Sequence, residues 1–185
     1  MAPHPAGFLE ATITYLEMRA PPASLPELRP PAGVRLTLLR AEKPTLAFYR
    51  FLYDTVGEGY HWVDRKRMSD ARLRTIIEDE RVEIYVLYVG GVPAGYAELD
   101  RRTPPEIELA YFGLMPGYLG RGLGSYFLNW AVRRAWEFGP RRVWVHTNTM
   151  DHPHALPLYQ RFGFVAYARR TVAVDPNPNP PRDPD

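Results

Sequence analysis

The stretch PGYLGRGLGSYFLNW, residues 116–130, decides the fold of this chain. Residues 107–114 come just before it and are predicted to form a strand. After it, apolar residues recur with the spacing of a helix, at Phe127, Leu128, Ala131, Val132 and Trp136. The glycines therefore lie in a turn between a strand and the start of a helix. Because the first N–H groups of a helix have no partner within it, this corner can bind an anion such as phosphate.

Four interpretations of this glycine turn are open from its own sequence. A P-loop requires a lysine after its last glycine, and this turn has none. A dinucleotide fingerprint has the spacing GxGxxG early in a βαβ unit, whereas Gly120, Gly122 and Gly124 follow GxGxG late in the chain. The other two interpretations are a site for the pyrophosphate of coenzyme A and a plain tight turn.

Length and composition predict a single globular domain. The chain has 185 residues, of which 45% are hydrophobic and 13% aromatic. It has no cysteine, which excludes disulfides, a thiol nucleophile and cysteine metal ligands. A formal net charge of +2 does not indicate a nucleic-acid partner. We find neither a secretion signal nor an apolar run near the ~18 residues of a membrane span, so we expect a cytoplasmic protein with no membrane partner.

The pattern of elements divides the chain into three regions. Residues 1–32 are predicted to be an N-terminal extension with an added edge strand and a proline-rich loop. Residues 33–174 follow the order β-α-α-β-β-β-α-β-α-β, which favours an α/β (α+β) fold with a mixed sheet and helices on both faces. Residues 175–185 alternate proline with polar residues and are predicted to be a flexible tail.

Two motifs, in this order and at this spacing, resemble the GCN5-related N-acetyltransferase (GNAT) family. The turn LGRGLG, residues 119–124, is similar to the family's [QR]-x-x-G-x-[GA]. The segment ALPLYQRFGF, residues 155–164, is similar to its later N-x-x-A-x-x-L-Y-x-x-x-G-F. The matching residues are Gly122, Gly124, Ala155, Leu158, Tyr159, Gly163 and Phe164.

The resemblance covers residues 34–174 and has two departures. Leu119 stands where Gln or Arg is usual in the family, and His152 stands where Asn is usual. Loss of the first polar side chain need not remove anion binding, because backbone N–H groups do most of it and Arg121 supplies charge. The second departure affects one hydrogen bond on the cofactor side.

The resemblance implies a fold and an activity. The fold is a mostly antiparallel central sheet with about four flanking helices, in which two strands splay apart as a V. The activity is transfer of an acetyl group from acetyl-CoA to an amine, on a small molecule or a peptide. Without a cysteine, we expect direct attack in a ternary complex. Family members often pair, so a homodimer is expected.

The expected donor site has two parts. Backbone N–H groups of the glycine turn would hold the pyrophosphate. The thioester carbonyl would lie against backbone groups of the splayed strand, where the resemblance implies a bulge; Gly113 within a strand itself indicates a bulge or a close approach. The expected cofactor-binding residues are Phe112, Gly113, Leu114, Leu119, Gly120, Arg121, Gly122, Leu123, Gly124, Ser125 and His152.

The catalytic candidates are carboxylates and one tyrosine. An ammonium is not a nucleophile, so a base or a water path must take its proton. Glu108 matches the position of a glutamate base in some family members, and Glu106 would point to the same face of the strand. Glu98, on the preceding strand, is a third candidate. Tyr159 matches the tyrosine that protonates the leaving thiolate in the family.

Other residues have weaker interpretations. Tyr60 and Trp62 fall in the loop where the resemblance implies the acceptor pocket, and they could equally pack under it. Asp151, His152 and His154 form a weak metal-ligand pattern, so no metal is expected. Two rival functions are a catalytically silent acyl-CoA-binding domain and a nucleotide-binding oxidoreductase. The second lacks the acidic ribose partner expected about 20 residues after the glycines.

Overall fold

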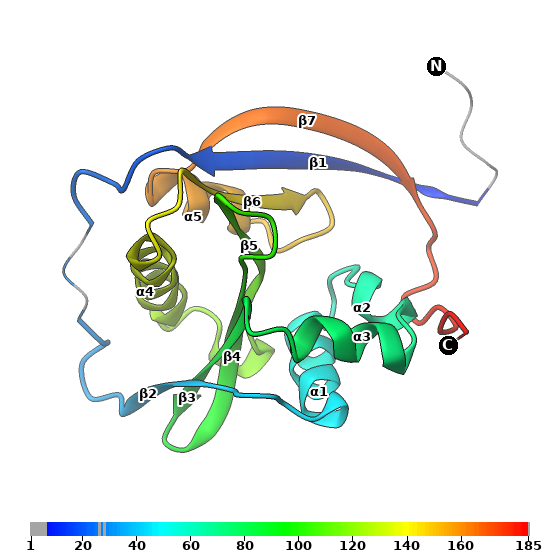
Figure 1. The fold of residues 1–185 in the computed structure, drawn as a ribbon, viewed down its shortest axis with the longest axis horizontal. Coiled ribbons are helices and arrows are strands. Elements are labelled where there is room, and N and C mark those ends of the chain that lie inside the picture. Colours follow the sequence, from blue (N-terminus) through cyan, green and yellow to red (C-terminus); the bar gives the residue numbers. More distant parts are fainter. Residues whose placement is uncertain (1–6, 26, 28, 185) are drawn as a thin grey trace.

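The computed structural model describes residues 7–25, 27 and 29–184. This part of the chain forms one seven-stranded sheet with five α-helices and one 3₁₀ turn, η1 (Figure 1). In chain order the elements are β1 (Leu9–Met18), β2 (Leu36–Arg40), α1 (Leu46–Val56), α2 (Asp64–Arg67), α3 (Asp70–Ile77), β3 (Val82–Val89), β4 (Val92–Asp100), β5 (Glu106–Leu114), η1 (Pro116–Tyr118), α4 (Leu123–Glu137), β6 (Arg142–Asn148), α5 (Ala155–Arg161) and β7 (Val165–Val174).

The sheet is mixed and mostly antiparallel, as predicted. Its strand order is β2-β3-β4-β5-β6-β1-β7, and β5 and β6 form its parallel pair. Their ladder runs from Glu106 opposite Arg142 to Glu108 opposite Trp144, although β5 continues to Leu114 and β6 to Asn148. The two strands therefore separate beyond Glu108, which confirms the predicted V. We call this separation the fork.

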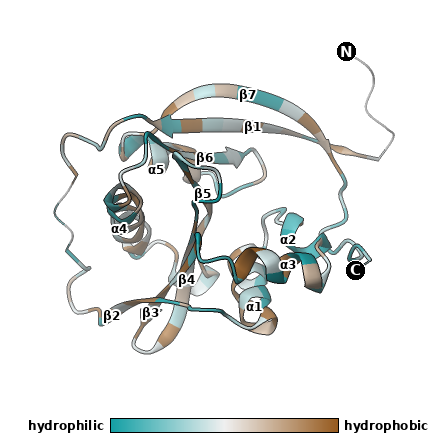
Figure 2. Ribbon diagram, viewed as in Figure 1, coloured by the Kyte–Doolittle hydropathy of each residue, from teal (hydrophilic) through white to brown (hydrophobic). Residues whose placement is uncertain are grey.

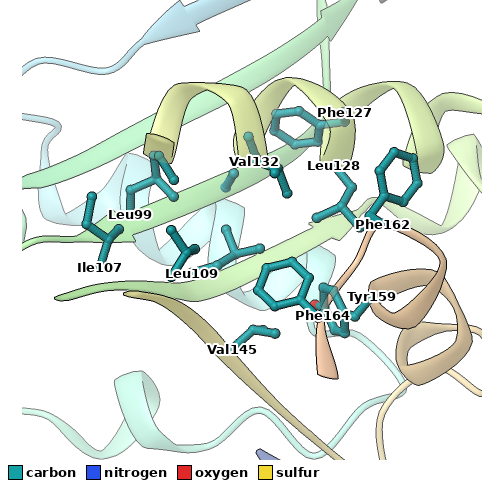
Figure 3. Close-up of a cluster of buried hydrophobic side chains, with 14 of the residues drawn as sticks. Leu99, Ile107, Leu109, Phe127, Leu128, Val132, Val145, Tyr159, Phe162 and Phe164 are labelled. Carbon is teal, nitrogen blue, oxygen red and sulfur yellow. The ribbon is translucent and has the colours of Figure 1, made fainter. Parts of the chain in front are cut away.

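Two hydrophobic cores lie on opposite faces of the sheet. One packs α4 and α5 against the strands, with Phe127, Leu128 and Phe162 among its buried side chains (Figure 3). The other packs α1 and α3 against β3 and β4, around Leu52 and Leu73. Figure 2 shows hydrophobic residues on the β3–β4 hairpin, which lies between α4 on one side and α1 and α3 on the other. Both faces of the central strands are therefore covered, and the fork lies where the ends of β5 and β6 separate.

Several elements formed where the local sequence predicted them. Ser69 caps α3, since its hydroxyl accepts a hydrogen bond from the Arg72 N–H at 3.2 Å. Gly90 and Gly91 both have positive φ angles, 59° and 88°, and close the β3–β4 hairpin. The four-residue helix α2 was not predicted, because its sequence DRKR has no apolar periodicity.

The predicted edge strand in the N-terminal extension is not at an edge. β1 lies between β6 and β7 and pairs antiparallel with both. Thr14, Leu16 and Met18 are buried at every second position and fix its inner face. Its partners lie at the other end of the chain, so no local pattern could reveal an interior position.

The C-terminal tail lies against α2 and α3. Arg67 pairs with Asp175 at 3.0 Å, and Arg182 pairs with Asp70 at 3.3 Å. The Asp183 N–H donates to the Arg67 carbonyl at 2.6 Å. In the described residues, no helix combines the length and apolar character needed to cross a membrane.

Candidate active site at the fork

A cavity of about 690 Å³ lies at the fork, and we call it the fork cavity. It is lined by β5 from Leu109 to Leu114, the glycine turn, the end of β6, α5 and the loop before α2. Most predicted cofactor residues line it: Phe112, Gly113, Leu114, Leu119, Gly120, Gly122, Gly124, Ser125 and His152. Its described lining does not include Arg121 or Leu123, and Leu123 is buried in the core beneath α4.

The glycine turn presents the start of α4 to this cavity. Gly120 and Gly122 have φ angles of 72° and 75°, which side chains with a Cβ rarely adopt. Gly122 is the N-cap, and no side chain among the described residues caps the helix. A Cβ at Gly124 would meet Leu114 and Leu158 at 3.8 and 3.9 Å, an ordinary contact, so packing does not require glycine there. The turn therefore leaves the N–H groups of the first helical turn open to an anion.

A cation missed by the sequence analysis lies beside this helix start. Arg161, in the last turn of α5, donates from Nη2 to the Ser125 hydroxyl at 2.6 Å and lines the fork cavity. Arg121, which was expected to supply charge, instead has its guanidinium 5.5 Å from the centre of the Tyr118 ring. Arg161 belongs to the RFGF part of the second motif, and this was the signal that could have identified it in the sequence. Only the fold, however, brings α5 to the start of α4.

The strand irregularity of β5 differs from the prediction. The β4–β5 register shifts between Glu98 and Leu99, which leaves Ala110 as the extra residue, whereas Gly113 pairs regularly with Tyr96. The prediction of a bulge at Gly113 is therefore wrong. Its alternative, a close approach, is confirmed, because a Cβ on Gly113 would lie 2.5 Å from Val56 Cγ1.

Backbone groups of β5 face the fork beyond its ladder with β6. The Met115 N–H donates to the Ala94 carbonyl of β4 at 2.8 Å. Backbone groups alternate between the two edges of a strand. Those of Leu114 and Phe112 are therefore directed away from β4, toward the fork.

Tyr159 lies between the fork cavity and the core. Its ring packs edge-on against Phe164, with the ring centres 5.8 Å apart (Figure 3). It also packs edge-on against Phe112, with the ring centres 6.3 Å apart. Burial raises the pKa of its hydroxyl, and the negative charge of Asp151 raises it further. At neutral pH the group is therefore protonated and can donate a proton.

Two of the three candidate carboxylates are held by arginines. Glu98 is fully buried and accepts hydrogen bonds from the Tyr49 hydroxyl and from Arg65. Glu106 accepts from Arg142 Nη1 at 3.1 Å on both of its oxygens. Both therefore have structural partners that occupy the lone pairs a base would use.

Glu108 has a different partner. Its Oε1 lies 3.3 Å from Nδ1 of His146 on β6. Glu108 lines a second cavity of about 450 Å³, which also includes Asp64, Tyr111 and His146, and we call it the second cavity. His146 was not singled out in the sequence, because its proximity to Glu108 comes from the pairing of β5 with β6.

Asp151 connects the loop before α2 to the end of β6. It accepts hydrogen bonds from Trp62 Nε1 at 3.1 Å and from the Thr147 hydroxyl at 2.7 Å. Tyr60 packs edge-on against His152 at 5.9 Å, and both rings line the fork cavity. The described residues hold no group of three or more metal-ligating side chains.

These features define a class of protein: an α+β fold with a forked sheet, whose cavity joins an open helix N-terminus to unpaired strand edges. The model of the acetyltransferase (GNAT) family matches residues 44–164. An uncharacterized N-acetyltransferase of Mycobacterium tuberculosis is 31% identical over 107 residues, which cover 58% of this chain and 68% of that protein. This chain belongs to the GNAT family of acetyltransferases.

Solved structures show the same fold. A putative GNAT acetyltransferase from Novosphingobium aromaticivorans matches with a TM-score of 0.59 and 18% identity, over 94% of this chain and 68% of that chain. An aminoglycoside N-acetyltransferase in complex with CoA matches with a TM-score of 0.52 and 19% identity, over 74% of this chain and 92% of that chain.

Proposed function

We propose that this protein transfers an acetyl group from acetyl-CoA to a primary amine in a ternary complex. The observation that carries the proposal is the fork cavity, because it joins the open start of α4 to the gap between β5 and β6. Family membership and the similar structure solved with CoA support acetyl-CoA as the donor.

The donor's pyrophosphate suits the start of α4. N–H groups of the glycine turn and the positive end of the helix dipole would bind its charge. Arg161, hydrogen-bonded to Ser125, adds a cation at the same corner. The thioester would then lie along the fork edge of β5, where backbone groups of Phe112 and Leu114 are available to its carbonyl.

The chemistry needs a base, an oxyanion partner and an acid. The amine nitrogen, once deprotonated, attacks the thioester carbonyl carbon, and the oxygen takes up negative charge near the Leu114 N–H. Collapse of this intermediate breaks the C–S bond, the thiolate takes a proton from Tyr159, and Tyr159 regains a proton from the attacking nitrogen, which loses its second proton as the amide forms. The group that accepts the proton from the ammonium would be at the fork, where Glu108 and His146 lie together.

A thiol-release screen tests this function. The purified chain is mixed with acetyl-CoA and amines that include amino acids, polyamines, aminoglycosides and short peptides, and each acetylated product is confirmed by mass spectrometry. We expect free CoA and one class of acetylated amine. Gly122→Glu should abolish both, because a carboxylate at the N-cap repels the pyrophosphate. Acetyl-CoA binding without any acetylated product would instead indicate a silent acyl-CoA-binding domain, and a thermal shift with NAD alone would indicate an oxidoreductase.

We also expect a homodimer, which sedimentation of the purified chain would test. An unchanged monomer mass across concentrations would contradict it.

A further inference from the structure

Glu108 and His146 meet where β5 and β6 separate. Glu108 and Trp144 form the last pair of the parallel ladder, and His146 is two residues beyond Trp144 on the same face of β6. The imidazole Nδ1 lies 3.3 Å from the Glu108 carboxylate. The contact therefore spans the base of the fork.

The two side chains differ in what they face. His146 lines both the fork cavity and the second cavity, while Glu108 lines the second cavity. Among the described residues, Nε2 of His146 has no hydrogen-bond partner. On the proposed function, an amine that enters the fork cavity would therefore meet the imidazole, which lines that cavity, and not the carboxylate, which lines the second cavity.

This arrangement leads to an assignment of roles, and the assignment rests on the proposed function. We propose that His146 is the catalytic base and that Glu108 is its positioning residue. Neutral His146 carries its proton on Nδ1 and donates it to Glu108 Oε1, which leaves the lone pair of Nε2 free. Nε2 takes one proton from the ammonium group, the freed amine attacks the thioester, and the imidazolium later releases that proton to solvent.

The charges around His146 support this assignment. Burial alone would lower the pKa of His146, but its hydrogen bond to Glu108 and the charges of Glu108, Asp151 and Asp64 raise the pKa above its ordinary value. These carboxylates come from β5, from the loop after β6 and from α2. Tyr15 of β1 packs against the imidazole with its ring centre 5.9 Å away.

The cations of the second cavity do not cancel these carboxylates. Arg65 pairs with Glu98 at 2.6 Å, Arg67 with Asp175 at 3.0 Å and Arg102 with Asp100 at 2.5 Å. The fourth cation is Arg72, which is exposed on α3.

Because the base form of His146 prevails above its raised pKa, turnover should rise with pH through that value and then level off.

Kinetics over a range of pH separate the two roles. His146→Gln should lower kcat by about 10²-fold or more and remove the limb of the pH profile that belongs to the imidazole. Glu108→Gln should keep that limb but move it to lower pH, with a smaller loss of kcat. Glu106→Gln is the matched control, because it neutralises a carboxylate two residues away that pairs with Arg142; it should keep the wild-type profile. If this limb of the pH profile disappeared in Glu108→Gln but remained in His146→Gln, the assignment would be overturned and Glu108 would be the base.

Two measurements do not depend on turnover. NMR titration of the full chain should show a lower His146 pKa in Glu108→Gln than in the wild type, with the resonance identified by its loss in His146→Gln. Calorimetry should give His146→Gln an acetyl-CoA affinity close to that of the wild type. An unchanged pKa in Glu108→Gln would overturn the coupling of the pair. Transfer by His146→Gln at the wild-type rate would overturn this assignment alone, whereas absence of transfer by the wild type to any amine would overturn the proposed function.

Discussion

Arg65 holds α2 against the sheet, and Arg65→Met should destabilise the fold by about 3–5 kcal/mol. Its Nη2 lies 2.6 Å from the Glu98 carboxylate, and the two side chains are 7% and 0% exposed. Its Nε also donates to the Tyr49 hydroxyl at 3.1 Å. Methionine fills similar space but cannot pair, so the variant leaves the Glu98 charge buried with the Tyr49 hydroxyl as its remaining side-chain donor. This uncompensated charge is the source of the expected loss.

Urea unfolding at neutral pH, followed by circular dichroism, measures this loss. At a slope of about 2 kcal/mol per molar urea, the midpoint should fall by about 2 M while the slope stays unchanged. Arg74→Met is the matched control, because Arg74 pairs with Glu78 on α3 where the side chains are 54% and 50% exposed. It should cost less than about 0.5 kcal/mol.

A double variant tests whether the cause is the buried charge. Arg65→Met combined with Glu98→Leu removes both charges, and an apolar pair in place of a buried ion pair is often close to neutral. The double variant should recover most of the stability lost by Arg65→Met, apart from about 1 kcal/mol for the unpaired Tyr49 hydroxyl. A single-variant loss below about 1 kcal/mol, or a double variant no more stable than the single one, would refute this reasoning.

Three further predictions concern the fork. Arg161→Met should weaken acetyl-CoA binding by about 10–100-fold in calorimetry, and less at high salt, because a charge-assisted contact is lost; Arg121→Met should weaken it less, and the reverse order would contradict the assignment of Arg161. Tyr159→Phe should lower kcat by about 10²-fold with little change in acetyl-CoA affinity, and full activity would mean that water protonates the thiolate. Gly113→Ala should destabilise the fold by about 1–3 kcal/mol in urea, because its Cβ would lie 2.5 Å from Val56 Cγ1; added Val56→Ala should restore part of this, and a fully stable Gly113→Ala would show that α1 can shift.

The sequence was sufficient where a short segment determines its own conformation. Gly120 and Gly122 need positive φ angles, and Ser69 supplies its own capping oxygen. These signals predicted the start of α4 and the start of α3. Each depends on contacts within a few residues, so the chain around it matters little.

The sequence was insufficient where contacts cross the sheet. Gly113 suggested either a bulge or a close approach, and only the position of α1 decides for the close approach. The bulge instead lies at Ala110, and nothing in the sequence around Ala110 indicates one. His146 alternates with buried neighbours as any half-exposed strand residue does. Its possible chemistry depends on Glu108, which the parallel ladder places beside it.

The fork itself depends on β1, which the sequence analysis assigned to an extension outside the main domain. β1 pairs with β6 from Ile13 opposite Asn148 to Met18 opposite Val143, along almost the whole strand. β6 therefore has its hydrogen bonds on that side satisfied up to its end, while its ladder with β5 stops at Trp144. A strand fully paired on one edge can leave its other neighbour at little cost in hydrogen bonds, provided that the freed edge is solvated or binds a ligand. The N-terminal strand thus supports β6 along the part that diverges from β5, and it leaves free at the fork the strand edges to which the proposed function assigns the thioester.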